Sequence, residues 1–133
     1  MNEDTRWVQR LNNYRKAFAL LERSLAIENP TELERAGIIQ FYEMAFELSW
    51  KIMKDFLESK DIKTMFARDA IKHAFQSELI EEGGLWLKAL DDRNLTSHTY
   101  AEETAEEVLE KIRTMYFPLL KQFLRVMENQ IQK

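Results

Sequence analysis

The sequence has 133 residues, 45% hydrophobic and 32% charged, which predicts one globular domain covering residues 1–133. It contains no cysteine, which excludes disulfides and thiolate metal sites, and its two histidines argue against an all-protein zinc site. The net charge of -4 excludes a global basic field for nucleic acid, so any RNA contact must be local or built by an oligomer.

The distribution of apolar residues argues against export and membrane insertion. The first residues, Met-Asn-Glu-Asp, lack the basic segment and apolar run of a signal peptide. No stretch approaches the roughly 20 apolar residues of a membrane span. We therefore expect a cytoplasmic protein that makes no membrane contact. Glycine (3) and proline (2) are scarce, which favours a few long helices over strands joined by many turns.

A first helix is predicted from about Asp4 to Ile27. Apolar residues recur at alternating steps of four and three and form one stripe: Trp7, Leu11, Tyr14, Phe18, Leu21 and Leu25. Between them lie the basic residues Arg6, Arg10, Arg15, Lys16 and Arg23. This basic flank reads either as a solvated helix face or as a surface that faces phosphate or acidic groups.

A second helix is predicted from Thr31 to Ser59, because Thr31 and Glu34 have the spacing of a capping box after Pro30. Its polar residues fall in one narrow strip on a helical wheel: Gln40, Glu43, Glu47, Lys51, Lys54 and Glu58. Almost everything else from Ile38 to Leu57 is apolar, which is a wider apolar surface than one bundle face needs. We expect a second copy of the chain to cover part of it, which predicts a homodimer.

Two shorter helices follow. Thr64 is the expected N-cap of a third helix that runs to about Ser77, with His73 at the surface and a packing face of Phe66, Ala70, Ile71, Ala74 and Phe75. After the break at residues 81–84, a fourth helix starts near Leu85 and buries Leu85, Trp86, Ala89 and Leu90.

The last helix is predicted from Ala101 to Gln130, where apolar residues keep a heptad-like spacing. Pro118 lies inside this helix and removes the hydrogen bond to the carbonyl of Thr114, so a kink is expected there. Three long and two shorter helices with short connections predict an all-α fold, an up-and-down helical bundle of about five helices.

The stretch from Asp91 to Tyr100 contains the candidate functional side chains. Arg93 offers a planar fork of donors for phosphate, His98 can transfer a proton near neutral pH, and Tyr100 adds a hydroxyl. These side chains suit metal-free RNA cleavage, in which histidine moves a proton of the ribose 2′-hydroxyl or leaving oxygen and arginine stabilises the phosphate charge. They equally suit binding a nucleotide without chemistry, or a charged helix end in which Arg93 pairs with Asp91, Asp92 or a glutamate.

Helical geometry limits how these residues can meet. On one unbroken helix, Arg93 and Tyr100 share a face, but His98 lies about 140° from Arg93. The helix must therefore end between them, or two chains must share the site. Both arrangements agree with a dimer that has this stretch at its interface.

The motif Arg93-x4-His98-x-Tyr100 resembles the signature of HEPN-domain proteins, in the branch of nucleotidyltransferase substrate-binding subunits related to HepT toxins. Two longer segments agree: Gln40, Phe41, Glu43, Glu47, Leu48, Trp50 and Lys51 of the second helix, and Gly84-Leu85-Trp86-Leu87 leading into the motif. The resemblance covers nearly the whole chain. Thr64-Met65-Phe66 departs from the Ser-Pro that relatives often have, which affects a helix start and not the chemistry.

The resemblance implies a HEPN-like helical homodimer with a cognate minimal nucleotidyltransferase as partner, and no cofactor or metal. In one description the protein is a toxin, a metal-independent ribonuclease that the transferase silences by attaching adenylate to the motif tyrosine. Arg93 and His98 would then cleave RNA and Tyr100 would be modified, with Asp92, Asn94 and Thr96 in support. In the alternative description it is a non-catalytic subunit that binds nucleotide or substrate for the transferase.

Overall fold

The computed structural model describes the backbone of residues 3–96 and 102–133, and the side chains of residues 5–93 and 105–133. This part of the chain is helical and contains no strand. The helices are α1 (Glu3–Leu25), α2 (Glu32–Ser59), α3 (Ala67–Gln76), α4 (Gly83–Thr96), α5 (Glu102–Lys111) and α6 (Phe117–Ile131), with a π-helical segment, η1 (Ile112–Tyr116), between the last two. The predicted all-α helical bundle is confirmed.

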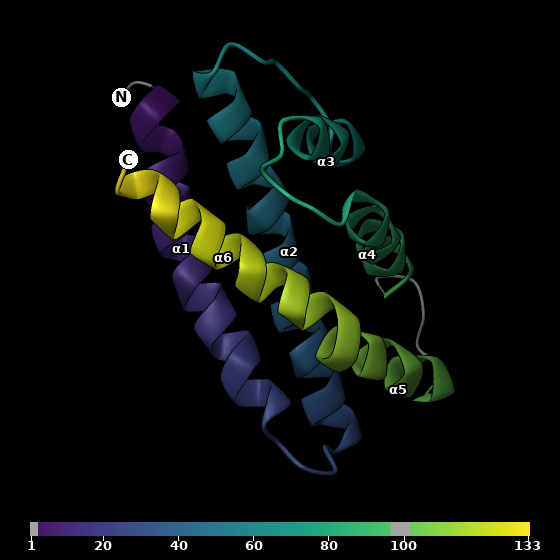
Figure 1. Ribbon diagram of the computed structural model, residues 1–133. Coiled ribbons are helices and arrows are strands. Elements are labelled where there is room, and N and C mark those ends of the chain that lie inside the picture. Colours follow the sequence, from purple (N-terminus) through teal and green to yellow (C-terminus); the bar gives the residue numbers. More distant parts are fainter. Residues whose placement is uncertain (1–2, 97–101) are drawn as a thin grey trace.

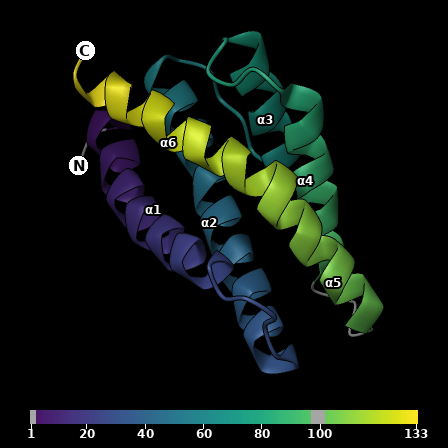
Figure 2. The same cartoon turned by 60° about the horizontal axis from the view of Figure 1, so that its bottom comes forward.

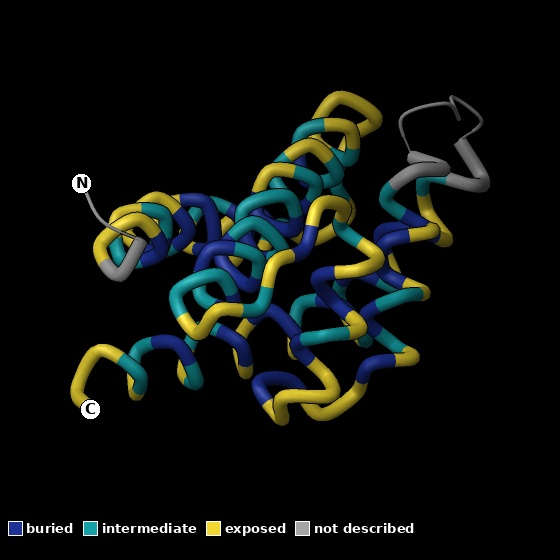
Figure 3. The backbone as a smooth tube through the Cα atoms, turned by 90° about the horizontal axis from the view of Figure 1, so that it is seen from above, coloured by how far each residue is buried: buried dark blue, intermediate teal, exposed yellow. Residues whose placement is uncertain are grey.

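Helix α2 is the central helix of the bundle. Helix α1 lies antiparallel beside it, α6 crosses both, and α3 and α4 lie on the opposite side of α6 from α1 (Figure 1). A second view shows α5 and α6 forming one nearly continuous rod that ends near the N-terminus (Figure 2). Buried positions line the inward faces of all these helices (Figure 3).

The position of α2 accounts for most of its unusual apolar surface. It packs against α1, α3, α4, α5 and α6 of its own chain, and it buries Ile38, Tyr42, Ala45, Phe46, Ile52, Met53 and Leu57. Large apolar side chains that stay exposed on α2 include Leu33 and Met44. A second copy is therefore not needed to explain the apolar pattern of α2 as a whole, and the homodimer stays a prediction.

The start of α2 confirms the predicted capping box. The Thr31 hydroxyl accepts a hydrogen bond from the Glu34 N–H at 3.1 Å, and the Glu34 carboxylate accepts one from the Thr31 N–H at 2.9 Å. The two side chains thereby satisfy backbone donors that a helix start leaves without partners.

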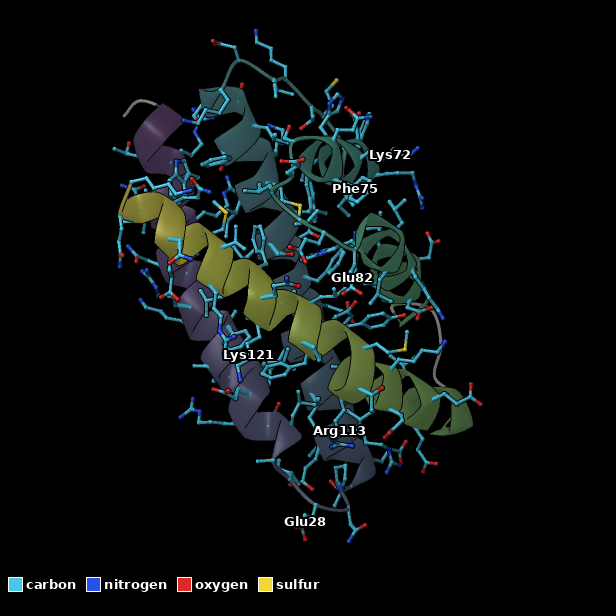
Figure 4. All side chains as sticks on the ribbon, viewed as in Figure 1. Glu28, Lys72, Phe75, Glu82, Arg113 and Lys121 are labelled. Carbon is cyan, nitrogen blue, oxygen red and sulfur yellow. The ribbon has the colours of Figure 1, made fainter. Side chains whose placement is uncertain are left out.

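The prediction for α3 is wrong in two respects. Thr64 is buried and does not cap the helix, which starts at Ala67 behind Phe66 without a side-chain cap. Phe66 and Phe75 are 70% and 50% exposed, so only Ala70, Ile71 and Ala74 of the expected packing face are buried. The helix is too short to bury a wider face. Phe75 instead covers Gly83. With Lys72 it borders a hollow of about 350 Å³ between α3 and the start of α4 (Figure 4).

The last helical run continues past Pro118, as predicted, with an irregular turn just before it. The chain forms a π-turn before it, closed by the Phe117 N–H and the Ile112 carbonyl, and α6 then starts with Pro118 in its first turn. Proline is tolerated there because the first N–H groups of a helix have no intrahelical partner. The helical run therefore continues past Pro118 with its register changed.

The basic flank of α1 is largely neutralised within the chain. Arg6 pairs with Glu58, Arg10 with Asp55 and Arg15 with Glu128. These pairs favour a structural reading of the flank over a phosphate-binding surface. Among the described residues, no helix combines the length and the apolar character needed to cross a membrane.

Candidate functional site

Arg93 lies near the end of α4, and its guanidinium is held from α2. Its Nη1 is 3.3 Å from Oε2 of Glu47, and the side chain is 27% exposed. The same carboxylate accepts a hydrogen bond from the Trp50 indole at 3.0 Å and lies 3.7 Å from Lys51 Nζ. Of the partners expected for Arg93 in a charged helix end, the structure therefore shows a glutamate, and it comes from a different helix.

Asp92, the residue before Arg93 in α4, faces the interior of the bundle. It is 8% exposed, its Oδ2 accepts a hydrogen bond from the Tyr116 hydroxyl, and the same oxygen lies 3.6 Å from Lys111 Nζ. Asp91, by contrast, is exposed and pairs with Arg68 of α3 at 2.6 Å. Two adjacent carboxylates thus fasten α4 to different neighbours.

The remaining predicted site residues are only partly within the described chain. The backbone places Asn94 and Thr96 in the last turn of α4, but their side chains lie outside the described residues. His98 and Tyr100 also lie outside them, between the end of α4 at Thr96 and the start of α5 at Glu102. The expected break in the helix and the meeting of Arg93 with His98 and Tyr100 therefore stay predictions.

Sequence reasoning did not find the buried tyrosines beside Arg93. Tyr42 and Tyr116 stack with ring centroids 5.8 Å apart, and the Tyr42 hydroxyl donates to the Ala89 carbonyl of α4 at 3.0 Å. Both tyrosines looked like ordinary core positions, since each follows the apolar spacing of its own helix. Their link to the site depends on contacts 24 and 47 residues apart, and no local pattern signals such contacts.

Burial raises the pKa of three tyrosines above the ordinary value of 10.0. Burial alone acts on Tyr14, while at Tyr42 the negative charges of Tyr116 and Asp92 add to it. For Tyr116, burial comes first and the hydrogen bond to Asp92 second. A raised folded-state pKa means that these tyrosines stabilise the fold below the unfolded-state value, and that this contribution is lost as the pH rises beyond it.

We therefore expect the free energy of unfolding to fall steeply above about pH 10. Each tyrosine contributes a slope of up to about 1.4 kcal/mol per pH unit, because the unfolded chain releases a proton that the folded chain keeps. Urea unfolding at a series of pH values measures this slope. Tyr14→Phe should make it shallower, whereas an unchanged slope in that variant contradicts the assignment.

The described part of the site contains no cluster of metal-binding side chains. Among the described residues, no group of three or more histidine, aspartate and glutamate side chains is placed to hold a metal ion. Arg93 is a cation that is partly open to solvent, and Glu47 is its counter-ion. The hydrogen bond between Asp92 and Tyr116 holds the turn of α4 that carries Arg93. Such an arrangement suits the binding of an anion such as phosphate.

Comparison with known proteins relates the chain to one family. The profile of the family described as "Nucleotidyltransferase substrate binding protein like" matches residues 9–129. A relative from Haemophilus influenzae named "Probable ribonuclease HepT" is 38% identical over 82 residues. That match spans 58% of this chain and 56% of the relative, so the chain matches about half of the length of this relative.

Two solved structures share the fold. One is a Haemophilus influenzae protein whose structure is described as revealing the fold of a substrate binding domain of a nucleotidyltransferase. The TM-score is 0.77 at 29% sequence identity, and the match covers 89% of this chain and 98% of that one. The other, from Thermus thermophilus, has a TM-score of 0.75 at 28% identity and covers 90% and 99%. The chain therefore belongs to the nucleotidyltransferase substrate-binding protein family, as its motif and second helix predicted.

Proposed function

We propose that this protein is a metal-independent endoribonuclease, the cytoplasmic toxin of a toxin–antitoxin pair whose other member is a minimal nucleotidyltransferase. Arg93 stabilises the charge on the scissile phosphate, and His98 transfers the proton of the attacking or leaving oxygen. The similarity to a relative named as a probable ribonuclease supports this reaction, and the family description supports the nucleotidyltransferase partner.

The observation that carries the proposal is the held but accessible guanidinium of Arg93. Its ion pair with Glu47 fixes its direction, and the side chain as a whole is 27% exposed, so solvent reaches part of it. Glu47 has Lys51 and the Trp50 indole as further partners, so its charge stays partly compensated when Arg93 also binds a phosphate. Arginine presents a planar fork that fits two phosphate oxygens at once.

Metal-free cleavage of RNA tests the reaction. Purified protein is incubated with RNA in the presence of a chelator, and initial rates are compared for the wild type and His98→Ala. We expect His98→Ala to lower the rate about 10²–10⁴-fold, because the proton transfer loses its catalyst. The matched control is His73→Ala, which removes the other histidine, a surface residue of α3 that pairs with Asp69. Equal rates for His98→Ala and the wild type would overturn the assignment.

The pairing with a nucleotidyltransferase is tested separately. We propose that the transferase moves adenylate from ATP to the Tyr100 hydroxyl, which loses its proton while pyrophosphate leaves, and that the adenylate blocks the neighbouring His98. The protein is mixed with the proposed partner nucleotidyltransferase and with ATP, and its mass is measured. A gain of one adenylate in the wild type but not in Tyr100→Phe supports the pairing, and no gain contradicts it.

A second candidate function is a non-catalytic, substrate-binding subunit of a two-component nucleotidyltransferase. The description of the similar Haemophilus influenzae structure as a substrate binding domain favours it. This function predicts stable co-purification with the transferase and nucleotide binding, together with no cleavage of RNA by the wild type. The two candidates are therefore separated by the same cleavage assay. We also propose a homodimer, which sedimentation of the purified protein tests.

A further inference from the structure

The part of α4 from Ala89 to Arg93 is fastened to four other elements, α2, α3, α5 and η1. Helix α2 contributes Tyr42, whose hydroxyl donates to the Ala89 carbonyl. Helix α3 contributes Arg68, which pairs with the exposed Asp91. The end of α5 and η1 contribute Lys111 and Tyr116, which both contact the buried carboxylate of Asp92.

The contact between Asp92 and Tyr116 differs from the others because it is buried. The two residues are 8% and 1% exposed, and each supplies the polar partner that the other needs. A buried carboxylate is costly unless it is paired and hydrogen-bonded, and a buried hydroxyl also needs a partner. If the end of α4 turned about its axis, the Asp92 carboxylate and the Tyr116 hydroxyl would separate. Both would then be buried without a hydrogen-bond partner and without water to replace it. This pair therefore fixes the rotation of the turn that carries Arg93.

The π-turn before Pro118 explains how two residues of one helix reach the same carboxylate. Lys111 and Tyr116 are five positions apart and would point about 140° away from each other on a regular α-helix. In η1 the Phe117 N–H bonds to the Ile112 carbonyl, five residues back, so residues five apart lie closer to one face. Both side chains then contact Oδ2 of Asp92.

We infer that Asp92 and Tyr116 are positioning residues for Arg93, so that their buried hydrogen bond sets the direction in which its guanidinium meets the substrate phosphate. Glu47 holds the guanidinium from α2, while Asp92 and Tyr116 hold the backbone that carries it. This inference rests on the proposed ribonuclease function. Displacing a charge-stabilising group by about 1 Å can slow a reaction on the order of 100-fold.

Tyr116→Phe tests the inference, with Tyr14→Phe as its matched control. The Tyr14 hydroxyl is also buried and also donates to the last helical run, to the Leu120 carbonyl at 2.7 Å, but this hydrogen bond does not involve α4. We expect Tyr116→Phe to lower kcat about 30–100-fold with KM nearly unchanged, because orientation matters most in the transition state. Tyr14→Phe should keep kcat within about twofold. Equal kcat for the two variants would overturn the inference.

Asp92 is tested by a graded pair of substitutions. Asp92→Asn keeps an oxygen that can accept the Tyr116 hydrogen bond, whereas Asp92→Ala removes it. We therefore expect Asp92→Asn to retain at least about tenfold more kcat than Asp92→Ala. Equal losses in both variants count against a role for this hydrogen bond.

A measurement that needs no activity separates this inference from the proposed function. The Nε–Hε resonance of Arg93, assigned by its loss in Arg93→Lys, is recorded by NMR in each variant. We expect Tyr116→Phe to shift it and Tyr14→Phe to leave it in place. An unmoved resonance in Tyr116→Phe overturns the positioning role even if the wild type cleaves RNA. A shifted resonance in a protein that does not cleave RNA supports positioning and rejects the ribonuclease.

Discussion

Replacing Arg10 by leucine is expected to lower the free energy of unfolding by about 3 kcal/mol. Arg10 Nε lies 2.8 Å from Oδ2 of Asp55, which is 3% exposed on the face of α2 that packs against α1. Removing the guanidinium leaves a buried carboxylate without its counter-ion, and that is far more costly than losing an exposed pair. Urea unfolding at neutral pH measures the difference.

The control for Arg10→Leu is Arg15→Leu, about one and a half turns further along α1. The ion pair of Arg15 with Glu128 is at the surface, so its loss should change the free energy of unfolding by less than about 1 kcal/mol. The double variant Arg10→Leu/Asp55→Leu should recover much of the stability, because no buried charge remains. If Arg10→Leu is no less stable than Arg15→Leu, the pair with Asp55 is not a significant source of stability.

Arg93→Ala is expected to slow metal-free RNA cleavage about 10²–10³-fold, under the proposed function. The guanidinium is the group positioned to stabilise the charge that builds up on the phosphate. Arg93→Lys should restore only part of the rate, because an ammonium lacks the planar fork that binds two phosphate oxygens. Initial rates at saturating RNA, with a chelator present, measure both effects.

Arg125→Ala is the control for Arg93→Ala, since Arg125 is an exposed arginine of α6, a helix that does not carry the motif. It should keep the wild-type rate within about twofold, whereas equal losses in Arg125→Ala and Arg93→Ala would indicate a general effect of charge on RNA binding. Thermal unfolding of both variants shows whether either substitution also alters the fold. If Arg93→Ala is fully active, Arg93 takes no part in the reaction.

Interactions between sequence neighbours could be predicted, and those between distant elements could not. The capping box of Thr31 and Glu34 was predictable because it joins residues three positions apart. The pair of Glu47 with Lys51 was predictable for the same reason. The pair of Glu47 with Arg93 joins residues 46 positions apart, and the motif marks Arg93 without marking its partner.

The packing of α3 and α2 shows the same limit at a smaller scale. The apolar spacing of α3 correctly predicted a helix, but it could not show that Phe66 and Phe75 lie beyond the reach of the core. The wide apolar surface of α2 was correctly read as a surface that needs cover, but the cover comes mainly from the other helices of the same chain. Hydrophobic pattern says which residues avoid water, and tertiary packing decides what covers them.

The sequence by itself determined the all-α class, the family, and the residues at which chemistry is expected, because these depend on local periodicity and on a short contiguous motif. The tertiary structure decided how the end of α4 is held. Asp92 became a buried partner of Tyr116, and Arg93 became an ion-paired cation at the edge of the site, only when α2, α4 and η1 packed together. Burial and long-range pairing are properties of that packing, since the cost of an unpaired buried group exists only once water has been excluded.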